Sequence, residues 1–414
     1  MRPQYSAQYN LTVQRELTKD MKLQLGYVGS QGHRLLATHD VNYGNPQTCL
    51  DLQAIADTYS GIGTDCAQLF ADSAFYVPPT FNGSDVIVPA QGLQLPYTGN
   101  GGGPMKIAGG TDLNTSYPNG ITLVGLRRYS APQCDPLTGT GCPGDGIEVF
   151  SSIFAQDTIA TSAYNSLQAS LEKRFTHGLQ FNAAYTFSKS FDQASSFEGL
   201  LNPIDPRRSR SLSTFDARHR IVLSYYWELP IQHFSGAKGK LLNGWALSGI
   251  TTFQTGFPIR IQSFADNELM YSVDFEDPGQ PNQLAPLHTQ RAQSHNNYFF
   301  DPNSFTENAS DSSQPLCTQQ AVFNCYDPTL FGSLGNARRT ICCGPHISNT
   351  DFAVLKTIAL GETKRIDFRA EFFNLFNHTQ FYNPDGSTSD GGQFGQVTQA
   401  RDPRLMQFAL KFFF

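Results

Sequence analysis

The sequence predicts an all-β protein built from long antiparallel strands, and three observations carry this prediction. Apolar and polar residues alternate with a period of two over many stretches of about nine to eleven residues. Short turns and long connections follow each other strictly along the chain. The composition, with 36 glycines and 24 prolines among 414 residues, favours turns and disfavours long helices.

Composition also excludes several classes of protein. The net charge of −6 and the pI near 5.8 provide no basic surface for nucleic acid. No run approaches the ~18 consecutive apolar residues of a membrane-spanning helix. The opening stretch, "MRPQYSAQYNLTVQREL", lacks the apolar core and the cleavage site of a secretory signal. We therefore expect neither spanning helices nor a signal peptide.

The first strands are expected near residues 4–17 and 21–36. Tyr5, Tyr9 and Val13 fall on one side of the first strand, whereas the polar residues between them fall on the other. The stretch "TKD" provides a turn between the two strands, so they form a β-hairpin. The same pattern predicts further strands near residues 160–175, 179–190, 216–230, 244–261, 350–361, 364–376 and 404–414.

Strand length and loop length together favour a transmembrane β-barrel. Tilted strands of about 9–11 residues cross a bilayer, whereas strands of soluble domains average only about 5–6 residues. The longest connections, 37–160 and 262–348, exceed what compact soluble domains usually contain. Barrels in membranes combine tight inner turns with long outer loops. Residues 1–414 are thus expected to form one antiparallel barrel segment of about nine strands, with short periplasmic turns and long extracellular loops.

The two faces of these strands differ in character. Tyr27, Tyr185, Phe187, Trp227 and Trp245 belong to the apolar face near strand ends, where aromatic residues meet the membrane interface. An arginine facing lipid at mid-depth would cost about 2–4 kcal/mol, so the charged face must line a polar lumen. The predicted lumen-facing charges are Glu172, Arg174, Arg220, Arg369 and Glu371.

The eight cysteines fall into close pairs within the long connections. Even numbers at short spacings favour disulfides and an oxidising compartment, although free thiols remain the alternative. No Cys-x-x-Cys pair or suitably spaced histidine indicates zinc. The expected disulfide cysteines are Cys49, Cys66, Cys134, Cys142, Cys317 and Cys325. The pairing of the adjacent Cys342 and Cys343 is left open.

Several stretches carry a family resemblance along nearly all the expected strands. They include "YNSLQASLEKRFTHGLQFNAAYTFSKSFD", "FDARHRIVLSYYWELP", "LLNGWALSGITTFQTGFPI", "FRAEFFNLFNHTQF" and "FGQVTQARDPRLMQFALKFFF". These residues resemble the C-terminal barrel of Oar-like TonB-dependent outer-membrane receptors. The resemblance is weakest across 45–160 and 265–335, which are expected surface loops.

This resemblance implies a location, partners and a terminal signal. The family's complete barrel has about 22 strands, a plug and energy supplied through TonB. No plug or TonB-contacting segment is recognised here, so we expect a C-terminal part of a larger receptor in the cell outer membrane. Its partners would be outer-membrane lipid, the barrel-assembly machinery, TonB through the plug, and an unidentified solute. The barrel-assembly signal would comprise Phe408, Leu410, Phe412 and Phe414.

The expected function is energy-coupled transport of a large or scarce solute. Asp216, His219 and His33 form no recognisable acid–base arrangement, so we expect no enzyme, catalytic residue, metal or cofactor. Two alternatives stay open: a barrel for surface assembly or secretion, and a secreted all-β adhesin or carbohydrate-binding protein. The sequence identifies neither the solute nor the direction of transport.

Overall fold

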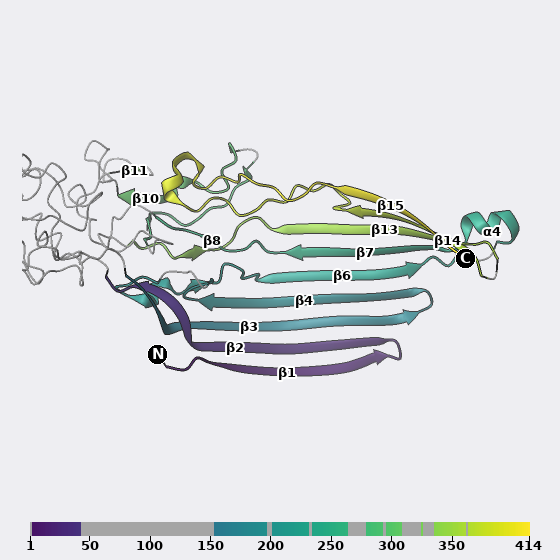
Figure 1. The fold of residues 1–414 in the computed structure, drawn as a ribbon, viewed down its shortest axis with the longest axis horizontal. Helices are drawn as coiled ribbons and strands as arrows, with labels where there is room; N and C mark the ends of the chain where they lie inside the picture. Colours follow the sequence, from purple (N-terminus) through teal and green to yellow (C-terminus); the bar gives the residue numbers. More distant parts are fainter. Residues whose placement is uncertain are drawn as a thin grey trace, which may run out of the picture.

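Nine long antiparallel strands follow one another in one sheet within the described chain (Figure 1). The computed structural model describes residues 2–42, 153–196, 201–231, 234–263, 279–292, 295–308, 324–325, 335–361 and 363–414. In order, the strands are β1 (Tyr5–Thr18), β2 (Met21–Asp40), β3 (Phe154–Thr176), β4 (Leu179–Asp192), β6 (His219–Glu228), β7 (Trp245–Gln254), β13 (Ile347–Ala359), β14 (Arg365–Phe373) and β15 (Leu405–Phe413). The predicted all-β, antiparallel fold is confirmed.

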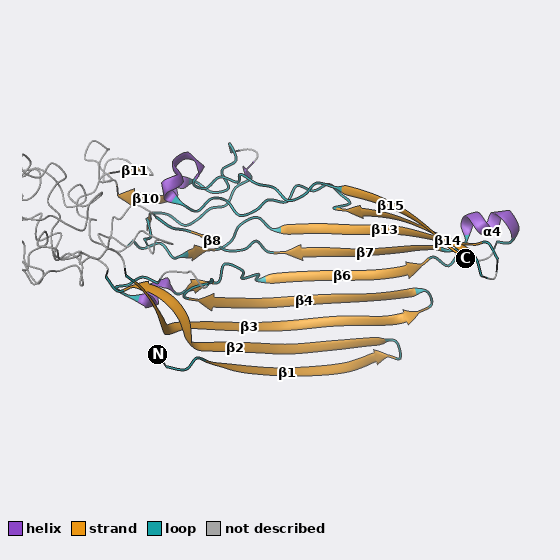
Figure 2. Cartoon of the chain, in the orientation of Figure 1, coloured by secondary structure: helices purple, strands orange, loops and turns teal. Residues whose placement is uncertain are grey.

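Shorter elements lie in the connections between the long strands. They are β5 (Ser211–Leu212), β8 (Ile259–Arg260), β9 (Asn282–Gln283), β10 (Phe305–Asn308), β11 (Asn324–Cys325), β12 (Thr340–Ile341), α4 (Gly236–Leu242), and the 3-10 turns η1 (Pro206–Ser209), η3 (Pro302–Ser304) and η5 (Thr388–Gln393). Figure 2 shows α4 at the short-turn end, opposite the short strands. Among the described residues, none of the helices combines the length and apolar character needed to cross a membrane.

The sheet is open, which fits a partial barrel. Within the described residues, β1 pairs with β2 and β15 pairs with β14, and β1 and β15 form the two edges of the sheet. Every residue of β1 is exposed, and β15 is exposed at all but one position. Exposed backbone at such an edge needs a partner strand inside a bilayer.

Strand register divides the sheet into a polar face and an apolar face, because directly paired residues share a face. One row runs across β1, β2, β3, β4 and β6 through Glu16, Lys22, Glu172, Asn182 and Ser224, and all five of these residues are polar. A neighbouring row on the other face is apolar, and it runs through Leu11, Tyr27, Leu167 and Phe187. The predicted alternation therefore places the expected residues on opposite sides of the sheet.

The apolar face is exposed although it is rich in large hydrophobic side chains. Leu11 is 69 % exposed, Leu167 50 % and Phe408 63 %. Such a continuous apolar surface is unstable in water and requires an apolar partner. Lipid around the strands is that partner in a membrane-spanning barrel.

Two strands are longer than the alternation indicates. β2 and β3 remain paired as far as Asp40 and Phe154, well into the connection expected from residue 37 to residue 160. The pairing shifts register around Leu35, and Arg34 adopts a positive φ of 55°. An irregularity of this kind bends a strand, and the bent end of β2 is visible in Figure 1.

Described parts of the connection 262–348 pack against Phe394, which belongs to the connection between β14 and β15. Phe300, Phe305 and Phe394 are fully buried and meet edge to face, with ring centroids 5.3–5.8 Å apart. They pack with Ile259 and Ile261 from the segment that follows β7. Aromatic burial of this kind supplies a small hydrophobic core to the long-loop end.

Candidate functional site

The polar face carries a hollow of 540 Å³ across the middle strands. Polar side chains line much of it, because β4, β6, β7 and β14 all direct alternate residues to this face. The polar lining includes Glu172, Asn182, Ser224, Ser248, Arg369 and Glu371. A hollow lined by hydroxyl, amide and charged groups suits water or a polar solute rather than lipid.

All five predicted lumen charges lie on this polar face. Arg369 forms an ion pair with Glu371, with 2.7 Å between Nη2 and Oε1. Glu172 lies 3.9 Å from Lys22, and Arg174 lies 4.0 Å from Glu16. The fifth predicted charge, Arg220, pairs in register with Gln254 of β7 and Thr186 of β4. Because both signs are interspersed, the face can contact neutral and zwitterionic solutes as well as ions.

A compact polar cluster fixes the first turn at the short-turn end. Asp20 accepts hydrogen bonds from Lys173 Nζ at 2.7 Å, Thr176 Oγ1 at 2.5 Å and Thr18 Oγ1 at 2.6 Å. The hydrogen bond from Lys173, followed by those from the two threonines, holds the pKa of the Asp20 carboxyl well below its usual range. The charged form of Asp20 thus joins the β1–β2 turn to the end of β3.

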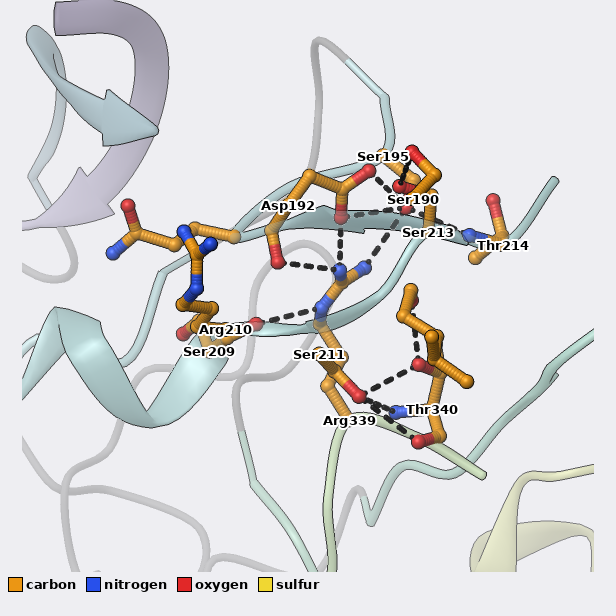
Figure 3. A network of polar contacts seen from close by, with 12 residues as sticks. Ser190, Asp192, Ser195, Ser209, Arg210, Ser211, Ser213, Thr214, Arg339 and Thr340 are labelled. Atoms are coloured by element: carbon orange, nitrogen blue, oxygen red, sulfur yellow. Dashed lines mark hydrogen bonds and ion pairs between the residues drawn. The ribbon is translucent and has the colours of Figure 1, made fainter. Parts of the chain in front are cut away.

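A second cluster lies at the long-loop end and centres on the buried guanidinium of Arg339 (Figure 3). Arg339 pairs with Asp192 at the end of β4, and its Nε donates to Ser209 O at 2.9 Å. Its neighbour Thr340 donates from Oγ1 to Leu212 O at 2.6 Å, and the Thr340 and Ser211 hydroxyls lie 2.7 Å apart. β12 also pairs with β8, so this segment joins β5 to β8 across the strands between them.

The alternation of apolar and polar residues does not indicate this second cluster. Asp192 follows the strand expected near residues 179–190, and Arg339 belongs to the distant connection 262–348. The excess of serines at 190, 195, 209, 211 and 213 was the available signal, because closely spaced small hydroxyls suit a buried hydrogen-bond network.

Most of the predicted cysteine pairs fall outside the described part of the chain. Cys49, Cys66, Cys134, Cys142 and Cys317 belong to that remainder. Only the backbone of Cys325 is described, in β11. The structure joins the adjacent Cys342 and Cys343 in a disulfide. The other pairings stay predictions.

The final aromatic stripe lies on the last strand of the sheet. Phe408, Leu410 and Phe412 share the apolar face, opposite Ala370, Phe368 and Ile366 respectively. Phe414 follows the strand, is 91 % exposed, and stacks on Phe412 with 5.9 Å between ring centroids. The stripe is therefore accessible from the edge of the sheet.

The residues weighed for acid–base chemistry have separate partners. Asp216 accepts a 2.7 Å hydrogen bond from Ser190 N, and His219 Nδ1 lies 2.9 Å from the Tyr185 hydroxyl. His33 stacks on Tyr5 in β1. Burial raises the pKa of Asp216 above its usual value. No group of three or more potential metal ligands occurs among the residues that the structure describes.

Comparison with known proteins identifies a family. The model of the outer membrane beta barrel domain family matches residues 1–407. No curated protein matches the chain. The crystal structure of the outer membrane transporter YddB from Escherichia coli is similar at 8 % identity and a TM-score of 0.41, over 100 % of this chain and 33 % of that one.

A second similar structure is Pseudomonas aeruginosa FpvA bound to heterologous pyoverdines. It has 9 % identity and a TM-score of 0.37, over 100 % of this chain and 28 % of that chain. The chain thus spans about a third or less of the length of these solved structures. The family match, and not these distant likenesses, carries the assignment.

Proposed function

This chain belongs to the outer membrane beta barrel domain family and lies in the cell outer membrane, and from that premise we propose that it forms part of the wall of a receptor for energy-coupled solute transport. The solute is large or scarce, since small abundant ones pass through open pores without energy. The two-faced sheet is the observation that supports this proposal most directly. Its apolar face suits lipid, while its polar face, with Glu172, Arg369 and Glu371 at the hollow, suits a solute path.

The proposal extends to the partners. TonB would supply energy through a plug domain, as the resemblance to Oar-like receptors implies. The barrel-assembly machinery would recognise the final aromatic stripe, which is exposed at the sheet edge. We assign the chain no catalytic role and no cofactor, and we place the long loops outside the cell and the short turns in the periplasm.

Transport can be tested in a Gram-negative host that carries the full-length gene. Uptake of labelled iron chelates, oligosaccharides and peptides would be measured in otherwise identical cells with and without TonB. We expect one class of solute to enter only in cells that contain TonB. We also expect the double variant Arg369→Gln/Glu371→Gln to lower that uptake, because it removes both charges of the hollow's ion pair.

A matched control is Lys238→Gln/Lys240→Gln, which changes two exposed charges in α4 at the short-turn end. Uptake that is independent of TonB would contradict the energy-coupled role. If a strain that lacks this gene takes up solutes normally but displays less of other proteins on its surface, the surface-assembly or secretion function would be favoured instead.

A further inference from the structure

A second hollow, of 380 Å³, lies at the long-loop end and is lined by arginines. The arginines are Arg207, Arg208, Arg210 and Arg338, and the aromatic ring of Phe191 completes one side. The described residues that line the hollow include no carboxylate. This concentration of positive charge is unusual in a chain whose net charge is −6.

Two segments hold the arginines together. Arg207, Arg208 and Arg210 lie in and just after η1, whereas Arg338 precedes β12. Arg208 Nη2 donates to Gly335 O at 2.7 Å, which fastens η1 to the segment that contains Arg338. The buried Arg339 cluster anchors the same two segments, and Figure 3 shows Arg210 alongside that cluster. The arginine hollow is therefore built on a fixed base.

The side chains at the hollow differ in how their charges are balanced. Arg207 pairs with Asp205 at 2.9 Å yet remains 89 % exposed. Arg210 donates to the neutral hydroxyl Thr161 Oγ1 at 3.0 Å. Arg338 is exposed, and no carboxylate partner neutralises it in the described part of the chain. Arg210 and Arg338 thus provide positive charge to a ligand, and an arginine fork matches phosphate oxygens.

Register shows which face of the sheet the hollow adjoins. Phe191 pairs with Ala163, and Lys189 pairs with Asn165, so both lie on the apolar face together with Phe187. The ring of Phe191 lies 4.9 Å from Lys189 Nζ and 5.9 Å from Arg210 Cζ, measured to its centroid. Basic groups around an aromatic ring are typical of the zone where lipid headgroups meet water.

The height of Phe191 on the sheet agrees with that zone. From Leu179 to Phe187, the apolar face of β4 extends about 27 Å along the strand, which is about 21 Å of height at a tilt of about 40°. The apolar band of an outer-membrane barrel is about 25 Å tall. Lys189 and Phe191 follow directly, at the level of the headgroups.

We propose that the arginine hollow, with Lys189 beside it, binds the phosphate group of a membrane lipid headgroup at the long-loop surface of the bilayer. Arg210 and Arg338 contact the phosphate oxygens, and Phe191 packs on the apolar part of the lipid. A lipid source fits better than a free anion, because the site adjoins the face that contacts lipid. This binding would attach the barrel to specific lipids of the surrounding leaflet.

Binding is tested with the full chain purified in a neutral detergent. The probe is lipid A, which carries phosphate monoesters on its headgroup, compared with phosphatidylcholine and with inorganic phosphate alone. Native mass spectrometry counts the bound lipids, and a titration gives the dissociation constant. We expect retention of lipid A, weak binding of phosphatidylcholine, and an affinity for lipid A about tenfold lower in Arg210→Gln/Arg338→Gln.

Two further variants make the result specific. Arg210→Lys/Arg338→Lys keeps the charge without the fork and is expected to bind with intermediate affinity. Lys238→Gln/Lys240→Gln removes equal charge at the opposite end and is expected to bind as the unaltered chain does. Unchanged lipid A affinity in a folded Arg210→Gln/Arg338→Gln variant would overturn the proposal. Inorganic phosphate binding as tightly as lipid A would overturn the lipid source. Neither outcome bears on solute transport.

Discussion

Arg339 and Asp192 form a buried ion pair between residues 147 positions apart in the chain, with side chains only 8 % and 7 % exposed. The pair joins the segment before β12 to the end of β4. Removing one partner of a buried pair leaves an uncompensated charge, which costs far more than losing an exposed pair. The folded state of the long-loop end therefore depends on this contact.

Arg339→Met is expected to destabilise the long-loop end by about 3–5 kcal/mol, because Asp192 then remains buried and unpaired. The rate of trypsin cleavage after the arginines of η1 would report the local opening. The adjacent and exposed Arg338→Met should change stability by no more than about 0.5 kcal/mol. The double variant Arg339→Met/Asp192→Leu removes both charges and should recover part of the lost stability. If it does not, the unpaired charge of Asp192 is not the cause of the destabilisation.

Asp20 is expected to make the short-turn end sensitive to acid. Its pKa is lowered in the folded state by Lys173 and the two threonines, so its charged form stabilises the fold. That stabilisation is present above the unfolded pKa of about 3.9 and is lost as the pH falls through the folded pKa. In urea unfolding, Asp20→Asn should therefore have a lower free energy of unfolding than the unaltered chain at pH 7 and at pH 5. The difference between the two should narrow below about pH 4. Lys19→Gln in the same turn is the control, and a gap independent of pH would contradict the assignment.

Asn165 is expected to stabilise three strands on the apolar face. Its Oδ1 accepts hydrogen bonds from the hydroxyls of Tyr27 at 2.7 Å and Tyr9 at 3.1 Å. Asn165→Ala removes the acceptor that both hydroxyls share, so two hydrogen bonds are lost and we expect a loss of about 2 kcal/mol. Urea unfolding in lipid vesicles would measure it. Asn10→Ala on the polar face of β1 should change the stability little. If Asn10→Ala and Asn165→Ala lost equal stability, the hydrogen bonds from the two tyrosine hydroxyls would not be responsible.

Phe414 is expected to control assembly more than stability. It is the most exposed large hydrophobic residue of the described chain, and it continues the aromatic stripe of β15. Phe414→Ser should lower the amount of folded protein in the outer membrane, as measured by its heat-dependent mobility on gels. Phe376→Ser, also strongly exposed but away from the terminus, should leave the yield unchanged. An undiminished yield for Phe414→Ser would contradict a signalling role.

The cysteine pairing predicted from spacing can be tested by non-reducing peptide mapping. We expect links from Cys49 to Cys66 and from Cys134 to Cys142, because each pair closes a short loop in an oxidising compartment. Reduction before digestion is the control that releases both links. Free thiols at all four positions would contradict the assignment of these connections to the cell exterior.

The alternation of apolar and polar residues was sufficient to predict both faces of the sheet. Glu172 and Arg369 could be placed on the polar face from their neighbours alone, because period two is a local property of a strand. The extension of β2 to Asp40 could not be predicted, since Gly32, His33 and Arg34 interrupt the pattern where the register shifts.

The Arg339 cluster and the arginine hollow were missed for a different reason. Each depends on segments that are distant in sequence and have no periodicity, so only tertiary folding brings them together. Arg207 and Arg338 belong to different connections, and their approach follows from the bond between Arg208 and Gly335 O. Local patterns cannot reveal such contacts.

The contacts that bridge the long-loop end have a mechanical consequence. Thr38 O accepts from Leu201 N, Ser209 O accepts from Arg339, and Thr340 pairs with Arg260. Together they tie the ends of β2, β4 and β7 to one another, while covalent turns tie neighbouring strands at the other end. A sideways force that tends to spread these strands is therefore shared among them. This part of the wall should resist shear and keep its curvature when a bulky molecule presses against it.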